Sequence, residues 1–186
     1  KEGKEWKSKA SADGSIVLRD HHYKMATNML REINGRRTFR RVAEEGLFEY
    51  ELSLNYEAEG VTYKARPDFY SPINGMVIDL KTTAAISNHG IRKSAYEYYY
   101  DVQAAMMTDA CYLNKLECWK VVFLFVSKAP PHDVRLIEFH PENINAARIK
   151  YLNLGLQLKQ AIELEDFRSK YPDEVECLDL GMDYRE

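Results

Sequence analysis

The chain has 186 residues, of which 45% are hydrophobic and 30% charged, and its formal net charge is −3 at pH 7. This length and composition predict a single globular domain with a substantial core, and they exclude a disordered or fibrous chain. No apolar run approaches the roughly 20 residues that a membrane-spanning helix needs. The polar, basic residues 1–9 lack the apolar stretch of a secretory signal, so we expect neither a membrane anchor nor secretion.

The cysteines and charges give further bounds on the setting and the partner. Cys111, Cys118 and Cys177 are widely spaced without a C-x-x-C pair, so they predict neither a zinc site nor a disulfide framework and favour a reducing, cytoplasmic setting. Four arginines crowd residues 36–41, whereas residues 163–186 are mostly acidic. Such a basic cluster can follow DNA phosphates despite the negative net charge, and an ordinary solvated face explains it equally well.

The first half of the chain is predicted to form one helix and then a hairpin of two strands. Apolar residues at helical spacing predict a helix over residues 19–33, which Asn34-Gly35 ends. Alternating apolar residues predict a half-buried strand over residues 47–56. A turn at Glu59-Gly60 then leads into an antiparallel strand over residues 61–66.

The second half is predicted to complete a mixed sheet. A turn over residues 71–75 precedes a strand that is apolar enough to be covered on both faces. A helix, a buried strand, an edge strand and a long helix with Pro141 at its first position follow. The covered strand is predicted over residues 76–80, the helix over 94–113 and the buried strand over 121–126. The edge strand is predicted over residues 134–139 and the long helix over 142–167. The order αβββαββα predicts an α/β or α+β domain, with a central mixed sheet and helices on each face.

Asp68, Asp79 and Lys81 form the pattern that carries chemistry. Asp79 and Lys81 are two residues apart on a strand, so their side chains leave the same face. A hairpin between strands 61–66 and 76–80 would bring Asp68 beside Asp79. Two neighbouring carboxylates repel each other unless a cation lies between them, and oxygen ligands of this kind suit Mg²⁺, with Mn²⁺ as a substitute. Lys81 would then stabilise a phosphate oxygen or orient a water molecule.

A same-face salt bridge between Asp79 and Lys81 would explain these two residues without any function. Further residues are therefore needed to decide between a salt bridge and a catalytic site. Glu49 lies on an earlier predicted strand, where it could supply a third carboxylate. Gln103 lies on the helix that follows, with Tyr99 and Tyr100 one turn before it and Tyr96 two turns before it. A packed aromatic face is the alternative explanation for some of these tyrosines, but we do not expect it to explain all of Tyr96, Tyr98, Tyr99 and Tyr100.

The order of these motifs resembles that of the exonuclease VIII group and related phage-type exonucleases of the PD-(D/E)xK superfamily. The resemblance covers roughly residues 49–126 and rests on Arg66-Pro-Asp, Asp79-Leu-Lys-Thr-Thr and a tyrosine-rich segment that leads to Gln103. It implies a restriction-endonuclease-like core and a 5′→3′ exonuclease on duplex DNA that leaves 3′ single strands for annealing. It also implies a ring-shaped homo-oligomer and a single-strand annealing protein as partner, in a bacterial or phage-infected cell.

The resemblance assigns roles to individual residues. Asp68, Asp79 and the backbone carbonyl of Leu80 would bind the metal, Lys81 would position the water and Glu49 would complete the acidic cluster. The supporting or DNA-binding residues would be Tyr96, Tyr100, Gln103, Thr82 and Arg66. Members of the exonuclease VIII group also use a histidine ligand on an upstream helix. Because His21 and His22 lie too close to Glu49 to match it, we expect that histidine in a portion preceding residue 1.

Three functions therefore stand as hypotheses. The first is a Mg²⁺-dependent exodeoxyribonuclease, and the second is a structure-specific or restriction-type endonuclease with the same fold. The third is a DNA-binding or assembly module that keeps the motif without catalysis. A branch of the superfamily with an iron–sulfur cluster is excluded, because its four cysteines are not matched by the three present here.

Overall fold

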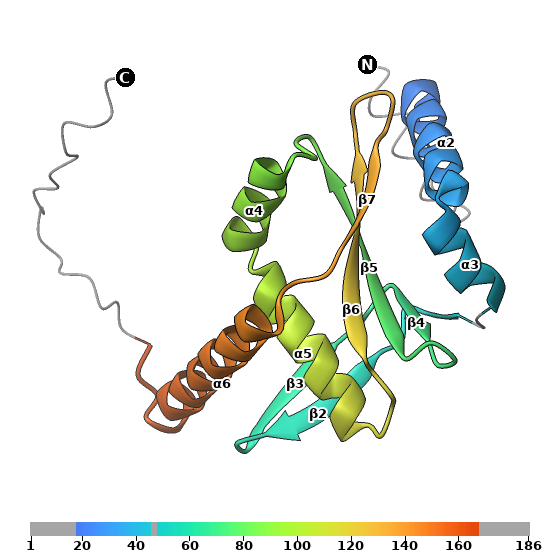
Figure 1. The fold of residues 1–186 in the computed structure, drawn as a ribbon. Helices are drawn as coiled ribbons and strands as arrows, with labels where there is room; N and C mark the ends of the chain where they lie inside the picture. Colours follow the sequence, from blue (N-terminus) through green and yellow to red (C-terminus); the bar gives the residue numbers. More distant parts are fainter. Residues whose placement is uncertain (1–17, 46–47, 168–186) are drawn as a thin grey trace, which may run out of the picture.

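A five-stranded mixed sheet lies between two groups of helices in the computed structural model, which describes residues 18–45 and 48–167 (Figure 1). The helices are α2 (Asp20–Gly35), α3 (Arg37–Glu45), α4 (Asn88–Glu97), α5 (Tyr100–Leu113) and α6 (Pro141–Glu163). The strands are β1 (Glu49–Tyr50), β2 (Leu54–Ala58), β3 (Val61–Ala65), β4 (Phe69–Ser71), β5 (Met76–Thr83), β6 (Lys120–Ser127) and β7 (Val134–Ile137). The sheet order is β1-β4-β5-β6-β7. The predicted α/β class with a central mixed sheet and flanking helices is confirmed.

The predicted strand over residues 47–56 is wrong as a single element. Within the described residues it forms β1 and β2, which belong to different sheets. Glu51 adopts a left-handed backbone conformation with φ of 54°, and this turn in the chain separates the two strands. Alternating apolar residues continue through the break, so the sequence pattern could not locate it.

The predicted hairpin after residue 56 is confirmed, but it does not extend the main sheet. β2 and β3 pair antiparallel from Leu54↔Ala65 to Ala58↔Val61, and both Glu59 and Gly60 have positive φ, as a tight hairpin turn requires. The pair forms a separate two-stranded sheet against α5. The expectation that strand 61–66 pairs with strand 76–80 is therefore wrong.

β4 is the strand that pairs with β5 in place of β3. It pairs antiparallel with both neighbours, Tyr70 lying opposite Glu49 on one side and Val77 on the other. β5 and β6 are parallel and in register from Met76↔Lys120 to Thr83↔Ser127, and β7 closes the sheet as the predicted edge strand. β4 has three residues, which is too short for an alternation pattern to predict.

The predicted helix over residues 94–113 is two helices, α4 and α5, so that prediction is corrected. α4 ends at Glu97, and Tyr99 precedes α5 in a left-handed conformation with φ of 52°. The break turns the chain so that α5 runs across the sheet while α4 lies near its edge (Figure 1).

The two sides of the central strands build two cores. Ile78 and Leu124 face α2 and α3, where Met29 and Ile33 cover them. Val77 and Phe123 face the opposite side, where Ala104 and Met107 of α5 cover them together with the β2-β3 hairpin. Burial on both sides explains the nearly continuous apolar sequence of β5 and β6.

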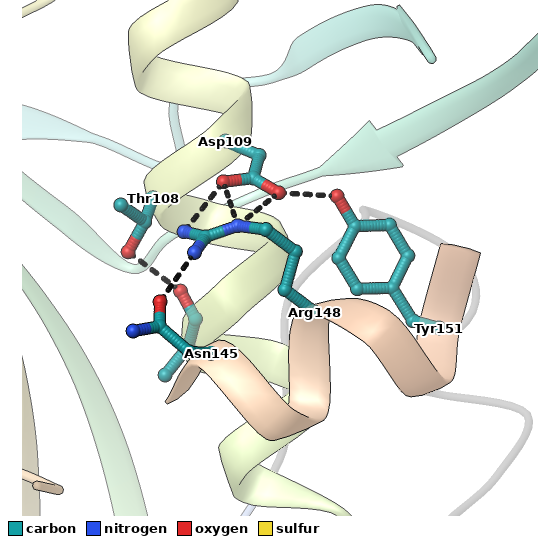
Figure 2. A network of polar contacts seen from close by, with 6 residues as sticks. Thr108, Asp109, Asn145, Arg148 and Tyr151 are labelled. Carbon is teal, nitrogen blue, oxygen red and sulfur yellow. Dashed lines mark hydrogen bonds and ion pairs between the residues drawn. The ribbon is translucent and has the colours of Figure 1, made fainter. Parts of the chain in front are cut away.

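α6 packs on the outer side of α5 through a polar network (Figure 2). Arg148 donates from Nε to both carboxylate oxygens of Asp109, at 2.8 and 2.9 Å, and Tyr151 donates to the same carboxylate. Burial raises the pKa of Tyr151, which keeps the hydroxyl a hydrogen-bond donor. At Gly155, where the helix meets β3, a Cβ would lie 1.8 Å from the Tyr63 hydroxyl oxygen, so only glycine permits this approach. Together these contacts fix where α6 lies.

Several expectations fall on residues outside the described ranges. They concern the polar start at residues 1–9, Leu47, Cys177 and most of the acidic segment 163–186. Among the described residues, no helix combines the length and apolar character needed to cross a membrane.

Candidate active site

β5 brings the two residues of the Asp-x-Lys motif to the face that α5 covers. Asp79 and Lys81 alternate with Ile78 and Leu80, so they lie on the same side as Val77. Their neighbours on β6 are Phe123 and Phe125, both fully buried. The motif is therefore set into an apolar face, where a charged group is costly unless it is paired.

Asp79 is a buried carboxylate held by two side chains. Its Oδ2 accepts a hydrogen bond of 2.8 Å from Nε2 of Gln103 on α5, and its Oδ1 is in ion-pair contact with the Lys81 ammonium. Burial raises the pKa of Asp79 above that of an ordinary aspartate, and the charge of nearby Asp68 adds to this, whereas Lys81 and Gln103 oppose it. The structure thus brings together four residues that the sequence pattern singled out.

Asp68 reaches the same site from the residue before β4. Its Oδ2 accepts a hydrogen bond of 2.7 Å from the backbone N–H of Leu80, the residue between Asp79 and Lys81. The expected closeness of Asp68 and Asp79 is thus produced by β4, not by the 61–66 strand. Asp68 is half-buried, whereas Asp79 is buried.

Aromatic rings surround the Lys81 ammonium. Its Nζ lies 4.7 Å from the centroid of the Tyr100 ring and 5.8 Å from that of Phe123, and Tyr100 stacks on Phe123 at 5.6 Å. Contacts of this kind stabilise a cation that is partly removed from water. Tyr100, which was predicted as a supporting or DNA-binding residue, therefore lies at the site beside Lys81.

Other predicted residues lie away from this group. Tyr96 is 86% exposed on α4, and Thr82 is exposed on the face of β5 opposite Asp79. Glu49 is exposed in β1, beside Tyr70. Across the described ranges, no three His, Cys, Asp or Glu side chains form a group able to hold a metal ion, so the structure does not gather Glu49 with the two aspartates.

Glu51 and Thr83 are neighbours of the site that the sequence pattern did not single out. The backbone N–H of Glu51 donates to the Asp68 carbonyl at 3.0 Å, and its carboxylate pairs with Arg66 at 3.0 Å. Glu51 directly follows β1 and lies two residues after Glu49 in the chain. Thr83 bonds through Oγ1 to both backbone groups of Ala85 and fixes the turn after β5. Glu51 reaches the site because the chain breaks at this residue, and the sequence carries no signal of that break. The position of Glu51 could therefore not be predicted from the sequence.

The fold and this group of residues define a PD-(D/E)xK nuclease core, which confirms the resemblance. The chain belongs to the family described as "PDDEXK-like domain of unknown function (DUF3799)", whose model matches residues 1–180. A comparison with curated proteins found no match.

The chain is similar to several solved structures. One is a protein from Eubacterium rectale described as a "putative exonuclease", with a TM-score of 0.64 and 15% identity, over 96% of this chain and 70% of that one. Another is a phage related exonuclease from Haemophilus somnus, with a TM-score of 0.45 and 16% identity, over 84% of this chain and 79% of that one. At 15% identity, the similarity to the Eubacterium rectale protein shows the fold alone.

The carboxylates of this site fit the divalent metal ion that PD-(D/E)xK nucleases generally use. Asp68 and Asp79 supply hard oxygen donors, and a buried, negatively charged Asp79 gains from a cation beside it. Mg²⁺ usually takes only one or two carboxylates and fills its remaining positions with water and substrate phosphate. Two aspartates therefore fit the number of carboxylates that such an ion usually takes.

Gln103→Ala is expected to weaken metal-dependent DNA cleavage about 10- to 100-fold, the usual cost of removing a group that orients a metal ligand. The reason is that Asp79 Oδ2 loses its donor from α5 and the carboxylate is no longer held in one orientation. Initial rates of DNA degradation measure the effect. Gln157→Ala, on the exposed side of α6, is the matched control. Equal rates for both variants would show that Gln103 does not position Asp79 for the reaction.

Proposed function

We infer that this protein is a metal-dependent exodeoxyribonuclease that degrades linear double-stranded DNA from 5′ to 3′ and leaves 3′ single-stranded tails for recombination by strand annealing. One observation carries the catalytic part of this inference. A buried carboxylate, Asp79, is held between Lys81 and Gln103 next to a second carboxylate, Asp68. A stabilising salt bridge alone needs neither the second carboxylate nor the amide.

In this proposal each residue has a defined task. Asp68 and Asp79 hold the metal ion, together with the backbone carbonyl of Leu80, and the Leu80 N–H keeps the Asp68 carboxylate in place. Lys81 donates a hydrogen bond to a phosphate oxygen or to the attacking water, because its ammonium lies beside Asp79. Gln103 keeps Asp79 oriented. When bound, Mg²⁺ or Mn²⁺ would neutralise charge on the scissile phosphate and lower the pKa of the attacking water.

The remaining parts of the proposal rest on the resemblance and on the names of similar folds. The similar structure from Eubacterium rectale is described as a "putative exonuclease", which supports cleavage from a DNA end. The motif order resembles that of the exonuclease VIII group, which supports the 5′→3′ direction, a ring-shaped homo-oligomer, a single-strand annealing protein as partner and a cytoplasmic location.

The need for a DNA end tests this function. We expect the protein with Mg²⁺ to degrade linear duplex DNA and to leave covalently closed circular DNA of the same sequence intact. Linearising the circle with a restriction enzyme should make it a substrate, because an exonuclease starts only at an end. Strand-specific end labels then give the direction, and gel electrophoresis follows both reactions.

The other results of this experiment are equally informative. Cleavage of the closed circle would overturn the exonuclease and favour a structure-specific or restriction-type endonuclease. Binding of DNA without cleavage of any form, in Mg²⁺ or in Mn²⁺, would favour a DNA-binding module without catalysis.

A further inference from the structure

A cleft adjoins the candidate active site between β3 and the break that separates α4 from α5. Its volume is about 340 Å³, within the range of sites that bind small molecules, about 300–1,000 Å³. We call it the Tyr99 cleft, and its lining includes Lys64, Arg66, Tyr98, Tyr99, Gln103 and Met106. Gln103 also donates to Asp79, so the cleft and the proposed catalytic carboxylate share a residue.

Two tyrosine rings of the cleft are open to solvent although they adjoin an apolar core. Tyr98 is 60% exposed and Tyr99 is 51% exposed, which excludes core packing as the explanation of either ring. Tyr98 stacks on Tyr100 at 5.9 Å, and Tyr100 in turn lies over the Lys81 ammonium. A row of rings therefore connects the Tyr99 cleft with the lysine of the candidate active site.

The backbone at Tyr99 adopts a conformation that is unusual for a tyrosine. Tyr99 precedes α5 in the left-handed region with φ of 52°, and its side chain makes no capping hydrogen bond. This conformation is costly for a bulky residue, and glycine or asparagine would adopt it more readily. The need for a helix break therefore does not explain a tyrosine at this position.

Positive side chains surround the same rings. Lys64 on β3 and Arg66 just after it line the cleft, and Nζ of Lys150 lies 4.0 Å from the centroid of the Tyr99 ring. Lys150 is carried by α6, which the Asp109–Arg148 ion pair holds against α5 (Figure 2). Arg66 pairs with Glu51, but both side chains are more than half exposed, and such surface pairs are weak enough for a phosphate to compete.

We propose that the Tyr99 cleft binds an unpaired nucleotide of the DNA substrate. Its base stacks on the rings of Tyr98 and Tyr99, and its phosphates lie beside Lys64 and Arg66. Exposed aromatic rings next to positive charges are the combination by which proteins hold single-stranded DNA without reading its sequence. The proposal rests on the proposed DNA-cleaving function, since it places an unpaired nucleotide next to the carboxylate that would take part in cleavage.

The test uses a short DNA strand that carries 2-aminopurine at one end, in EDTA so that no cleavage occurs. Binding to the wild-type protein is expected to change the 2-aminopurine fluorescence, because this base reports stacking. Tyr99→Asn removes the ring yet suits the left-handed backbone, so we expect a folded variant whose affinity is about 5- to 150-fold lower, the effect of one base–aromatic stack. Tyr99→Phe keeps the ring and should bind as the wild type does.

Two controls make the outcome specific. Tyr112→Asn changes a tyrosine at the other end of α5 that is more exposed than Tyr99, and it should leave binding unchanged. Lys64→Gln should reduce the slope of log affinity against log salt concentration by about 0.7, the value for one phosphate contact with a single strand.

The proposal is overturned if the wild type does not alter the fluorescence, or if Tyr99→Asn binds as tightly as the wild type. Because EDTA prevents catalysis, this result is independent of nuclease activity. A protein that binds the strand but cleaves no DNA in Mg²⁺ would refute the proposed function and keep the Tyr99 cleft as a DNA site. If the protein cleaves DNA but Tyr99→Asn binds the strand as tightly as the wild type, the proposed function stands and the Tyr99 cleft is refuted as a DNA site.

Discussion

Lys81→Met is expected to reduce metal-dependent degradation of linear duplex DNA by at least about 10²- to 10³-fold, the usual effect of removing one preorganised donor from a reacting centre. Methionine keeps the length and the apolar stem that lie against Tyr100 and Phe123. The variant therefore removes the charge that faces Asp79 and leaves the packing of the site largely intact. Release of acid-soluble nucleotides from labelled DNA measures the rate.

Lys120→Met is the matched control for this experiment. Lys120 is exposed at the opposite end of the same sheet, beside Met76, so its loss alters the net charge equally without touching the site. Thermal unfolding should show that both variants are folded. Normal digestion by Lys81→Met would mean that the motif lysine is a structural partner of Asp79, and the proposed mechanism would be wrong.

The central strands and the long helices could be predicted because each has a regular pattern. β6 and the first half of β5 are largely apolar since both of their faces are covered, and α6 keeps helical spacing over most of its length. The Glu59-Gly60 turn could be predicted for a similar reason, because glycine accepts the positive φ that its position needs. These elements carry Asp79 and Lys81, which is why the motif could be placed correctly on the sheet.

The breaks could not be predicted, because they occur at residues that rarely adopt a left-handed conformation. Glu51 and Tyr99 both have positive φ, and neither a glutamate nor a tyrosine is a turn signal. Each break has a structural consequence. The first places Glu51 beside Asp68, and the second exposes Tyr98 and Tyr99 beside Gln103. Local patterns extended each element through its break, so they could not locate either break.

Tertiary pairing was the other limit of the sequence pattern. Asp68 was expected beside Asp79 through a hairpin with strand 61–66, and the proximity is real although β4 provides it. The short spacing between the two aspartates was informative. A short connection that reverses the chain brings the residues before it alongside the strand that follows it, whichever strand makes the pairing. Which strand makes the pairing depends on contacts across the whole sheet, which no local pattern contains.

Mn²⁺ is expected to stabilise the wild-type protein against thermal unfolding, and Asp79→Asn and Asp68→Asn should each lose this effect. A ligand present at one hundred times its Kd adds about 2.7 kcal/mol to the stability of the folded state. For a domain of this size that corresponds to a rise in Tm of about 5–10 °C. Asp133→Asn, at an exposed position before β7, is the control that should respond like the wild type. An equal rise in Asp79→Asn would show that the metal binds elsewhere.

The size of this stabilisation should depend on pH in a direction that the burial of Asp79 determines. Because burial raises the pKa of Asp79, the carboxyl takes up a proton at a higher pH than an ordinary aspartate does. Protons compete with the metal, so the rise in Tm should be complete at neutral pH and should disappear as the pH falls through that raised pKa. Without metal the sign is reversed. The folded state then holds the proton more tightly than the unfolded state, so this contribution to stability is present below the ordinary aspartate pKa and is lost as the pH rises through the raised one. Asp79→Asn cannot titrate at this position, so comparing its Tm with that of the wild type across pH, with and without Mn²⁺, separates the proton from the metal at a single carboxylate.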